Sequence, residues 1–313
     1  MMLAPELLRT LALDPAQHPR GQAHLSAASG LVRVQERFYV VADDEHHLGR
    51  FKTAVDAPIK LLRLFPGDLP TDQKQRKAKK PDLETLTSLP AMAGYPHGAL
   101  LALGSGSKPT RERGVLLALD AQGRVGKDGC LPPKRIDLSG LYKGLRGTLP
   151  LLNIEGCFVA NGVLHLLQRG NQADTRSACI RLDWHHAQAW LRGDDHETPR
   201  AETVDTIDMG PTDPAHGMAL SVTDACSLPG GAWAFSAVAE NTKDSYHDGP
   251  CIASAIGIVN ASNQVVQLHH LQGAPKVEGI TGQVSGGQLI LTLVTDADDP
   301  AVASQLLQVA LPY

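Results

Sequence analysis

Residues 28–49 read ASGLVRVQERFYVVADDEHHLG, and this stretch predicts an antiparallel β-hairpin. A short apolar run after Ser29 and a second run at residues 38–41 are joined by a basic and polar turn. Two short β-rich runs with such a connection are typical of a hairpin. The two chain ends of a hairpin lie at the same edge of a sheet. We therefore expect Ser29 and the Asp43-Asp44 dipeptide to emerge on one face.

Weaker copies of this stretch recur along the chain. Each copy starts with an oxygen-bearing residue, a small residue and an apolar one, and continues with a turn, a second apolar run and a polar cluster. The starting residues, called anchors below, are Ser29, Glu84, Glu155, Asp224 and Glu278, at steps of 55, 71, 69 and 54 residues. Propeller blades are four-stranded sheets of about 40–50 residues plus loops, arranged around one axis. The sequence therefore predicts an all-β, five-bladed β-propeller that forms a single domain over residues 1–313.

The last blade lacks a fourth strand in the sequence that follows it. Outer strands are predicted at residues 58–65, 204–207 and 265–271, but the chain ends after the run at 304–311. Residues 7–13, LLRTLAL, are expected to complete the last blade. A ring closed by strands from both ends of the chain leaves no exposed sheet edge. An open β-sandwich with a second domain is the alternative interpretation.

Composition limits the function classes. The chain is 42% hydrophobic and 20% charged, as in ordinary globular proteins. Its net charge of −4 gives no general attraction for nucleic acid or an anionic membrane. The five cysteines contain no CxxC pair and are expected to be buried free thiols. Because we find neither a signal-peptide pattern nor an apolar run long enough to span a membrane, we predict a cytoplasmic protein.

The anchors predict a metal site. If they begin the innermost strands, their side chains point at the propeller axis from one level. Converging carboxylates repel one another unless a cation compensates them. Ca²⁺ takes six to eight oxygen ligands in flexible geometry, whereas Mg²⁺ demands a stricter octahedron. We therefore predict a Ca²⁺ ion held by Ser29, Glu84, Glu155, Asp224 and Glu278. In the alternative interpretation, each anchor separately caps the turn that enters its strand.

The ends of the second strands predict a pocket for a small polar or phosphorylated ligand around this ion. Asp43 or Asp44 is a candidate general base, and Arg169 is suited to bind a phosphate bidentately. These three residues and Glu240 are the candidate catalytic residues. The candidate substrate-binding residues are His46, Ser105, Asn171, Asn241 and Asp296.

The inserts between the repeats are interpreted as loops. Residues 72–82, DQKQRKAKKPD, form a charge run, and such runs are most often solvated. Residues 138–145 and 184–191 each predict a short helical turn.

The repeats resemble those of the calcium-activated nucleotidases, the soluble apyrases. The segment SGLVRVQERFYVVADDEHHLG is similar to their SDV…LYSVDDRTG, and Lys276-Val277-Glu278-Gly279 is similar to the KYEG that opens their final unit. The resemblance implies a five-bladed propeller with a central Ca²⁺ and hydrolysis of nucleotides. It also implies Ser and Glu ligands for the ion, which match Ser29, Glu84, Glu155 and Glu278; Asp224 stands where the family has Ser.

The chain departs from the family pattern at two places. Glu45-His46-His47 replaces Arg-Thr-Gly, and Gln168-Arg169 replaces a pair of arginines. Both changes remove positive charge that would stabilise phosphoryl transfer, as expected for a divergent bacterial branch. The sequence thus predicts a calcium-binding propeller that hydrolyses a small phosphate ester or phosphoanhydride. The alternative is a non-catalytic ligand- or protein-binding propeller with a structural Ca²⁺.

Overall fold

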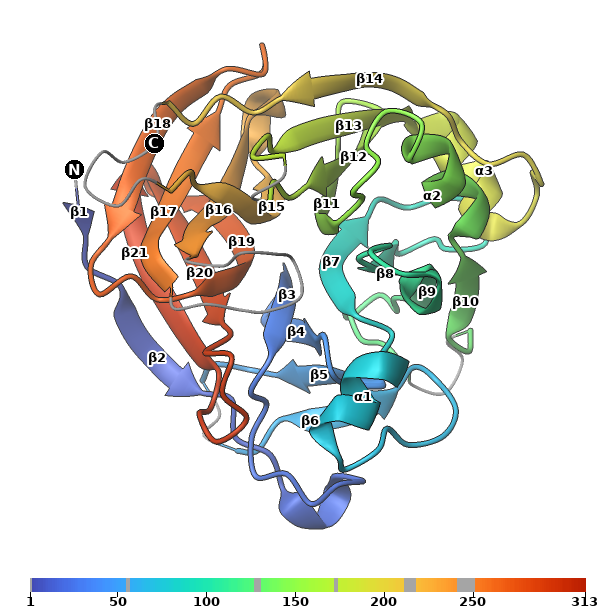
Figure 1. The fold of residues 1–313 in the computed structure, drawn as a ribbon, viewed down its shortest axis with the longest axis vertical. Helices are drawn as coiled ribbons and strands as arrows, with labels where there is room; N and C mark the ends of the chain where they lie inside the picture. The colour runs from blue at the N-terminus through green and yellow to red at the C-terminus, as the bar shows by residue number, and fades with distance from the viewer. Residues whose placement is uncertain (1, 55–56, 127–130, 172–173, 211–217, 241–250) are drawn as a thin grey trace.

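The protein is a five-bladed β-propeller, as predicted. The computed structural model describes residues 2–54, 57–126, 131–171, 174–210, 218–240 and 251–313. Its strands form five sheets that are arranged around a common axis (Figure 1). The innermost strand of each sheet begins close to one of the five anchors.

The blades follow one another in chain order. Blade 1 contains β3 (Ala28–Val34), β4 (Arg37–Ala42), β5 (His47–Phe51) and β6 (Lys60–Arg63). Blade 2 contains β7 (Leu83–Leu89), β8 (Ala99–Gly104), β9 (Arg113–Ala118) and β10 (Lys134–Asp137). Blade 3 contains β11 (Ile154–Ala160), β12 (Val163–Gln168), β13 (Ala178–Asp183) and β14 (Ala201–Thr206). Blade 4 contains β15 (Ser221–Ser227), β16 (Trp233–Glu240), β17 (Cys251–Val259) and β18 (Val265–Leu271). Blade 5 contains β19 (Val277–Ser285), β20 (Gln288–Thr295), β21 (Gln305–Pro312) and β2 (Glu6–Thr10).

The N-terminal segment closes the ring. Strand β2 pairs antiparallel with β21, with Leu7 opposite Leu307, which confirms the closure predicted for residues 7–13. Strand β1 (Met2–Leu3) was not predicted and pairs in parallel with β18 at the outer edge of blade 4. Strands β1 and β2 therefore extend two neighbouring blades and cover edges that would otherwise be exposed.

Every innermost strand carries a β-bulge near its start. In each of these strands one residue has no partner in the second strand of the blade. The residues on either side of it pair with two consecutive residues of that second strand. The five extra residues are Ser29, Glu84, Glu155, Thr223 and Glu278. A bulge re-aims one side chain relative to the pleat and is common beside functional sites. Its repetition in all five blades places five side chains at equivalent positions.

The small residue after an anchor has a packing role. A Cβ atom added to Gly30 would lie 2.6 Å from the backbone nitrogen of Leu86 in blade 2. A Cβ atom added to Gly279 would lie 3.0 Å from the backbone nitrogen of Leu31 in blade 1. The innermost strands of neighbouring blades thus approach too closely for a side chain at these positions, which explains the recurring anchor–Gly pattern.

The predicted helical turns at residues 138–145 and 184–191 are present. They form α2 (Ser139–Leu145) and α3 (Trp184–Arg192), and three short 3-10 helices lie at Pro15–Gln17, Pro109–Arg111 and Pro229–Gly231. Helix α2 buries Leu141, Tyr142 and Leu145 in the apolar core shared by blades 2 and 3. The Tyr142 hydroxyl donates a hydrogen bond of 2.6 Å to the carbonyl oxygen of Gly104.

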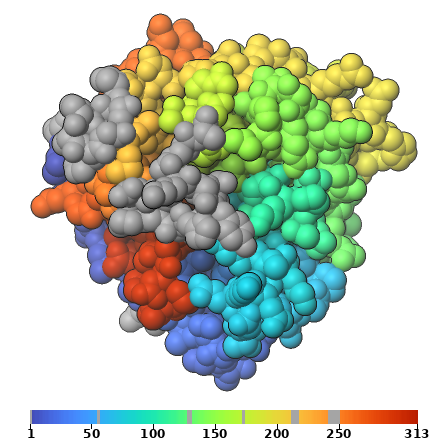
Figure 2. Space-filling view, viewed as in Figure 1, coloured from blue at the N-terminus to red at the C-terminus, as the bar shows by residue number. Residues whose placement is uncertain are grey.

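The interpretation of residues 72–82 as a solvated charge run is wrong for two of its basic residues. The segment forms α1 (Gln73–Lys79), and the Asp72 carboxylate caps it by accepting a 2.8 Å hydrogen bond from the backbone of Gln75. Arg76 and Lys80 are buried, and they pair with the carboxylates of Asp44 and Asp43, which follow β4. Figure 2 shows α1, in cyan, on the viewed face beside the red segment that follows β20.

The prediction of buried free thiols is confirmed for two of the described cysteines. Cys157 and Cys179 are buried free thiols, Cys226 and Cys251 are free but only half-buried, and Cys130 lies outside the described residues. Among the residues whose structure is described, no helix is both long and apolar enough to cross a membrane.

Candidate functional site

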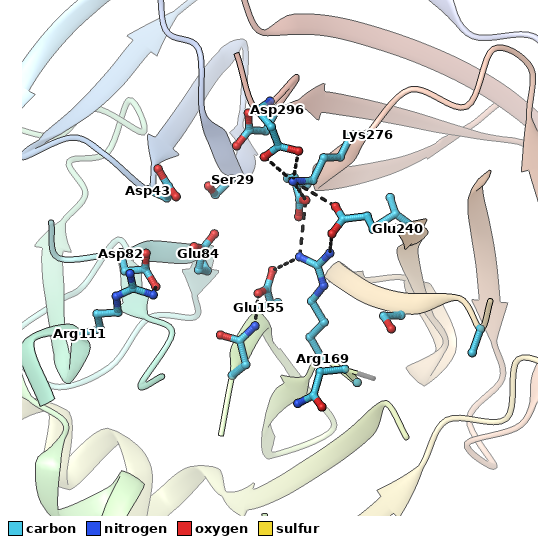
Figure 3. A pocket seen from close by; sticks show the side chains of 18 of the residues that line it. Ser29, Asp43, Asp82, Glu84, Arg111, Glu155, Arg169, Glu240, Lys276 and Asp296 are labelled. Atoms are coloured by element: carbon cyan, nitrogen blue, oxygen red, sulfur yellow. Dashed lines mark hydrogen bonds and ion pairs between the residues drawn. The ribbon is translucent and has the colours of Figure 1, made fainter. Parts of the chain in front are cut away.

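A cavity of about 390 Å³ lies where the innermost strands of all five blades converge (Figure 3). We call it the axial pocket. Its acidic lining residues are Asp43, Asp82, Glu84, Glu155, Glu240, Glu278, Asp296 and Asp298, and its basic ones are Lys77, Lys80, Arg111, Arg169 and Lys276. Eight carboxyl groups therefore face five cationic groups. No aromatic side chain is found among the described lining residues.

Four of the five anchors line the axial pocket together. They are Ser29, Glu84, Glu155 and Glu278, as the sequence analysis expected from their common level on the axis. All four are extra residues of the bulges. Their common position therefore has a backbone cause.

The fourth blade differs from the expectation by one residue. Its bulge residue is Thr223, whose hydroxyl donates a 2.7 Å hydrogen bond to the carbonyl oxygen of Val277. Asp224 does not line the pocket: it is buried and accepts a 2.9 Å hydrogen bond from the backbone of Ile280 in blade 5. Asp224 thus occupies the position that glycine holds in three other blades. The geometry gives Asp224 no contact with the axial pocket.

One half of the pocket is organised around Arg169, which directly follows β12 (Figure 3). Its Nη2 atom lies 2.9 Å from Glu240 Oε2, whereas its Nη1 atom lies 3.4 Å from Glu155 Oε2 and 3.6 Å from Glu278 Oε1. Lys276 supports the same acids, with Nζ 3.0 Å from Glu240 Oε1 and 3.4 Å from Glu278 Oε1. Two cations thus share three glutamates.

The other half contains the carboxyl groups of Asp43, Asp82 and Glu84. One oxygen atom of each lies within 4.8 Å of the others. Lys80 pairs with Asp43 and lies 2.8 Å from Asp82, and Arg111 lies 2.8 Å from the second oxygen of Asp82. Glu84 makes no hydrogen bond or ion pair with the described part of the chain.

The electrostatic cost of this arrangement appears in the pKa values of the anchors. Burial raises the pKa of Glu84 well above its usual range, and the charges of Glu155 and Asp82 raise it further. Burial also raises the pKa of Glu155 to about 8, and the nearby Arg169 only partly opposes this. Burial also raises the pKa of Glu278 above its usual range. These carboxyl groups lack enough positive charge around them.

The anchors offer the ligand types of a hard cation, but among the described pocket residues it is Asp43, Asp82 and Glu84 whose carboxylate oxygens lie within 4.8 Å of one another. Glu84 has no partner in the described structure, and both carboxylate oxygens of the buried Glu278 lack a hydrogen bond. Glu155 accepts a 2.5 Å hydrogen bond from Asn153, and the Ser29 hydroxyl donates to the carbonyl oxygen of Ala27, which leaves the oxygen free to act as a ligand. Carboxylate and hydroxyl oxygens are the ligand types that Ca²⁺ prefers.

The predicted pocket residues are only partly brought together. Asp43, Arg169, Glu240, Asn171 and Asp296 line the axial pocket, whereas Asn241 lies outside the described residues.

Three other predicted residues lie outside the lining. Asp44 pairs with Arg20 and Arg76 beside the pocket because these arginines reach it from the N-terminal segment and from α1. The His46 ring lies against Phe65 and does not enter the pocket. Ser105 is buried behind the lining and donates a 2.5 Å hydrogen bond to Asp82.

Several pocket residues were missed. Lys80 was assigned to a solvated linker, and four others lie two positions before a bulge residue: Asp82, Asn153, Ser221 and Lys276. Strand residues two apart share a face. The signal was therefore available as a polar residue two positions before the anchors Glu84, Glu155 and Glu278.

Fold and site together define a five-bladed propeller with a predominantly acidic axial pocket. The chain belongs to the family of unknown function DUF6929, which matches residues 24–311. No curated protein matches the chain.

Several solved structures are similar in fold. A putative glycoside hydrolase from Parabacteroides distasonis has 8% identity and a TM-score of 0.48, over 98% of this chain and 93% of that one. An endo-arabinanase from Bacillus licheniformis has 13% identity and a TM-score of 0.42, over 100% and 97%. A chain of a nidogen–laminin complex has 11% identity and a TM-score of 0.41, over 86% and 75%. At such identities the likeness concerns the fold alone, and the resemblance to nucleotidases stays a prediction.

Proposed function

We propose that the protein binds Ca²⁺ on the propeller axis and hydrolyses a small phosphate ester or phosphoanhydride in the axial pocket. The proposal rests on the charge balance of the pocket, in which eight carboxyl groups face five cationic groups. One of these carboxyl groups, that of Glu84, has no partner in the described structure. Buried charges of one sign are costly unless a counter-charge compensates them. A divalent cation would offset two of the three excess negative charges.

Ser29, Glu84, Glu155 and Glu278 would hold the ion, because they are the bulge residues that line the pocket. When bound, the ion would act as a Lewis acid toward a phosphoryl oxygen. Mg²⁺ is less suited, since four side chains from four blades do not impose an octahedron.

The basic side chains would bind the anionic substrate. Arg169 presents a planar guanidinium group, which matches two phosphate oxygens bidentately. Lys80, Arg111 and Lys276 lie in the same pocket and add positive charge. The absence of aromatic residues from the described lining favours such a ligand over a sugar, because sugar sites commonly use aromatic faces.

Asp43 is the best placed general base. Burial raises its pKa, and Lys80 beside it acts in the opposite direction and holds the carboxylate in place. A carboxylate with a raised pKa accepts a proton more readily near neutral pH. In the proposed reaction, Asp43 takes a proton from water as the water oxygen bonds to phosphorus and the bond to the leaving oxygen breaks.

The experiment is phosphate release from a panel of nucleotides and phosphomonoesters, with Ca²⁺ and with chelator. We expect Ca²⁺-dependent turnover of at least one compound and a loss of about 10²-fold or more in Asp43→Asn. Asp183→Asn, outside the pocket, is the matched control. Phosphate release that is absent from the whole panel would refute the hydrolase.

A non-catalytic propeller with a structural ion is the second candidate. It is favoured by the observation that Arg169 and Lys276 are already paired with carboxylates. Ca²⁺-dependent thermal stability without turnover of any compound would select this candidate.

A further inference from the structure

We propose that Arg169 competes with the axial cation for Glu155 and Glu278 and leaves them when an anion binds, so that cation and anion bind cooperatively. The inference rests on the cation site of the proposed function. It adds a coupling between the two ligands that neither site would have alone.

The contacts of Arg169 divide its guanidinium group into two parts. Nη2 makes a close ion pair with Glu240 at 2.9 Å, whereas Nη1 lies 3.4 Å and 3.6 Å from Glu155 and Glu278. The last two carboxylates belong to the predicted cation ligands. The contact with Glu240 is thus the stronger one, and the contacts with the two anchors are the ones that a small movement would break.

A cation on the axis and Nη1 cannot both be close to these two carboxylates at low energy. The pocket side chains are largely withdrawn from water, with Arg169 16% and Glu155 and Glu278 each 5% exposed. Charges there are screened less than on the surface. A bound Ca²⁺ would therefore repel the guanidinium group, and the guanidinium group would weaken the binding of Ca²⁺.

Lys276 reduces the energetic cost of moving Arg169 away from Glu240. Its Nζ atom lies 3.0 Å from Glu240 and is held by Asp298 at 2.6 Å. Glu240 would therefore keep a positive partner if Arg169 turned away. Lys276 itself is held by the carboxylates of Glu240, Glu278 and Asp298, so we expect it to stay in place.

An anion in the pocket would give the displaced guanidinium group a new partner. Asn153 and Asn171 line the pocket on the same blade as Arg169, and the Asn153 amide already donates to Glu155. An anion that stabilises Arg169 away from the anchors would raise the affinity for Ca²⁺, and Ca²⁺ would raise the affinity for the anion by the same factor.

The test is titration calorimetry of the metal-free full chain with calcium chloride, alone and with inorganic phosphate below the concentration at which calcium phosphate precipitates. In the wild type, phosphate should tighten Ca²⁺ binding roughly tenfold. This measurement needs no variant. A Ca²⁺ affinity that does not depend on phosphate would overturn the inference.

Three variants separate the coupling from the ion site. Arg169→Gln should bind Ca²⁺ alone roughly tenfold more tightly than the wild type and lose most of the phosphate effect. Arg169→Lys keeps the charge and should bind Ca²⁺ alone like the wild type. Arg176→Gln removes an exposed arginine that pairs with Asp174, and should change neither value.

The outcomes distinguish the two proposals. If the wild type binds Ca²⁺ but Arg169→Gln binds it equally or less tightly, the coupling is refuted and the ion site stands. If neither protein binds Ca²⁺ with or without phosphate, the ion site is refuted and the coupling with it. Binding by Arg169→Gln alone would support strong competition by Arg169.

Discussion

The substitution Glu155→Gln should stabilise the ion-free protein at high pH, and this gain should shrink when Ca²⁺ binds. In the ion-free protein the pKa of Glu155 is raised from 4.5 to about 8, first by burial. Because the folded state holds this proton more tightly than the unfolded state, the contribution of Glu155 is complete below about pH 4.5 and is lost as pH rises through about 8. One pKa unit corresponds to about 1.4 kcal/mol, so the full shift corresponds to about 4–5 kcal/mol.

Glutamine cannot ionise and keeps the oxygen that accepts from Asn153. The pKa of about 8 already includes the attraction to Arg169, so the gain in the free energy of unfolding should not exceed the full shift, and we expect about 2–4 kcal/mol at about pH 9 in chelator. In saturating Ca²⁺ this gain should shrink or disappear. An ion at one hundred times its Kd stabilises the wild type by about 2.7 kcal/mol and the variant, which lacks one ligand, by less.

The assay is urea denaturation, followed by tryptophan fluorescence, in chelator and in Ca²⁺ at about pH 5 and pH 9. The exposed Glu36→Gln serves as the control and should show no such difference between chelator and Ca²⁺. If Glu155→Gln is less stable than the wild type in chelator at about pH 9, the pair with Arg169 outweighs the repulsion among the carboxylates, and our electrostatic reasoning is wrong.

Three further predictions concern stability and are measured by chemical or thermal denaturation. Gly30→Ala should destabilise the protein by about 1–3 kcal/mol, because the new Cβ atom meets the backbone of blade 2. In the control Gly144→Ala the new Cβ atom meets nothing within 4 Å, so this substitution should be neutral or stabilising. Equal effects of the two substitutions would contradict the packing argument. Burial opposes the low pKa of Glu45, but a hydrogen bond from His18 and the nearby His47 and Arg20 bring it to about 2, so Glu45→Gln should cost about 2–3 kcal/mol at pH 7. Its effect should vanish as pH falls through about 2, and a constant effect would refute the assignment. Lys80→Met leaves two buried aspartates without their shared cation and should cost about 3–5 kcal/mol in chelator; a neutral result would show that Lys80 is not their main partner.

The repeat pattern made the fold predictable because each blade has the same local requirements. An anchor followed by a small residue marks a bulge and a close approach between blades, and Gly30 and Gly279 show why the small residue is needed. The closure by β2 followed from an unfilled place in blade 5. Strand β1 was not predictable, since two residues carry no periodicity.

The site was predictable only where the bulge coincided with the motif. In blade 4 the letters Asp-Ala-Cys imitate the anchor pattern, but the register makes Thr223 the bulge residue. The bulge depends on backbone pairing, which the sequence does not display. Lys80 was missed for another reason: its burial depends on Asp43 and Asp82, which come from two different blades.

The most direct test of the central claim is titration calorimetry of the metal-free wild type and of Glu84→Gln with calcium chloride. The account predicts one Ca²⁺ per chain in the wild type and binding at least tenfold weaker in the variant, because Glu84 is a ligand with no other partner in the described structure. Absence of binding by the wild type, or equal binding by both proteins, would contradict an ion on the propeller axis.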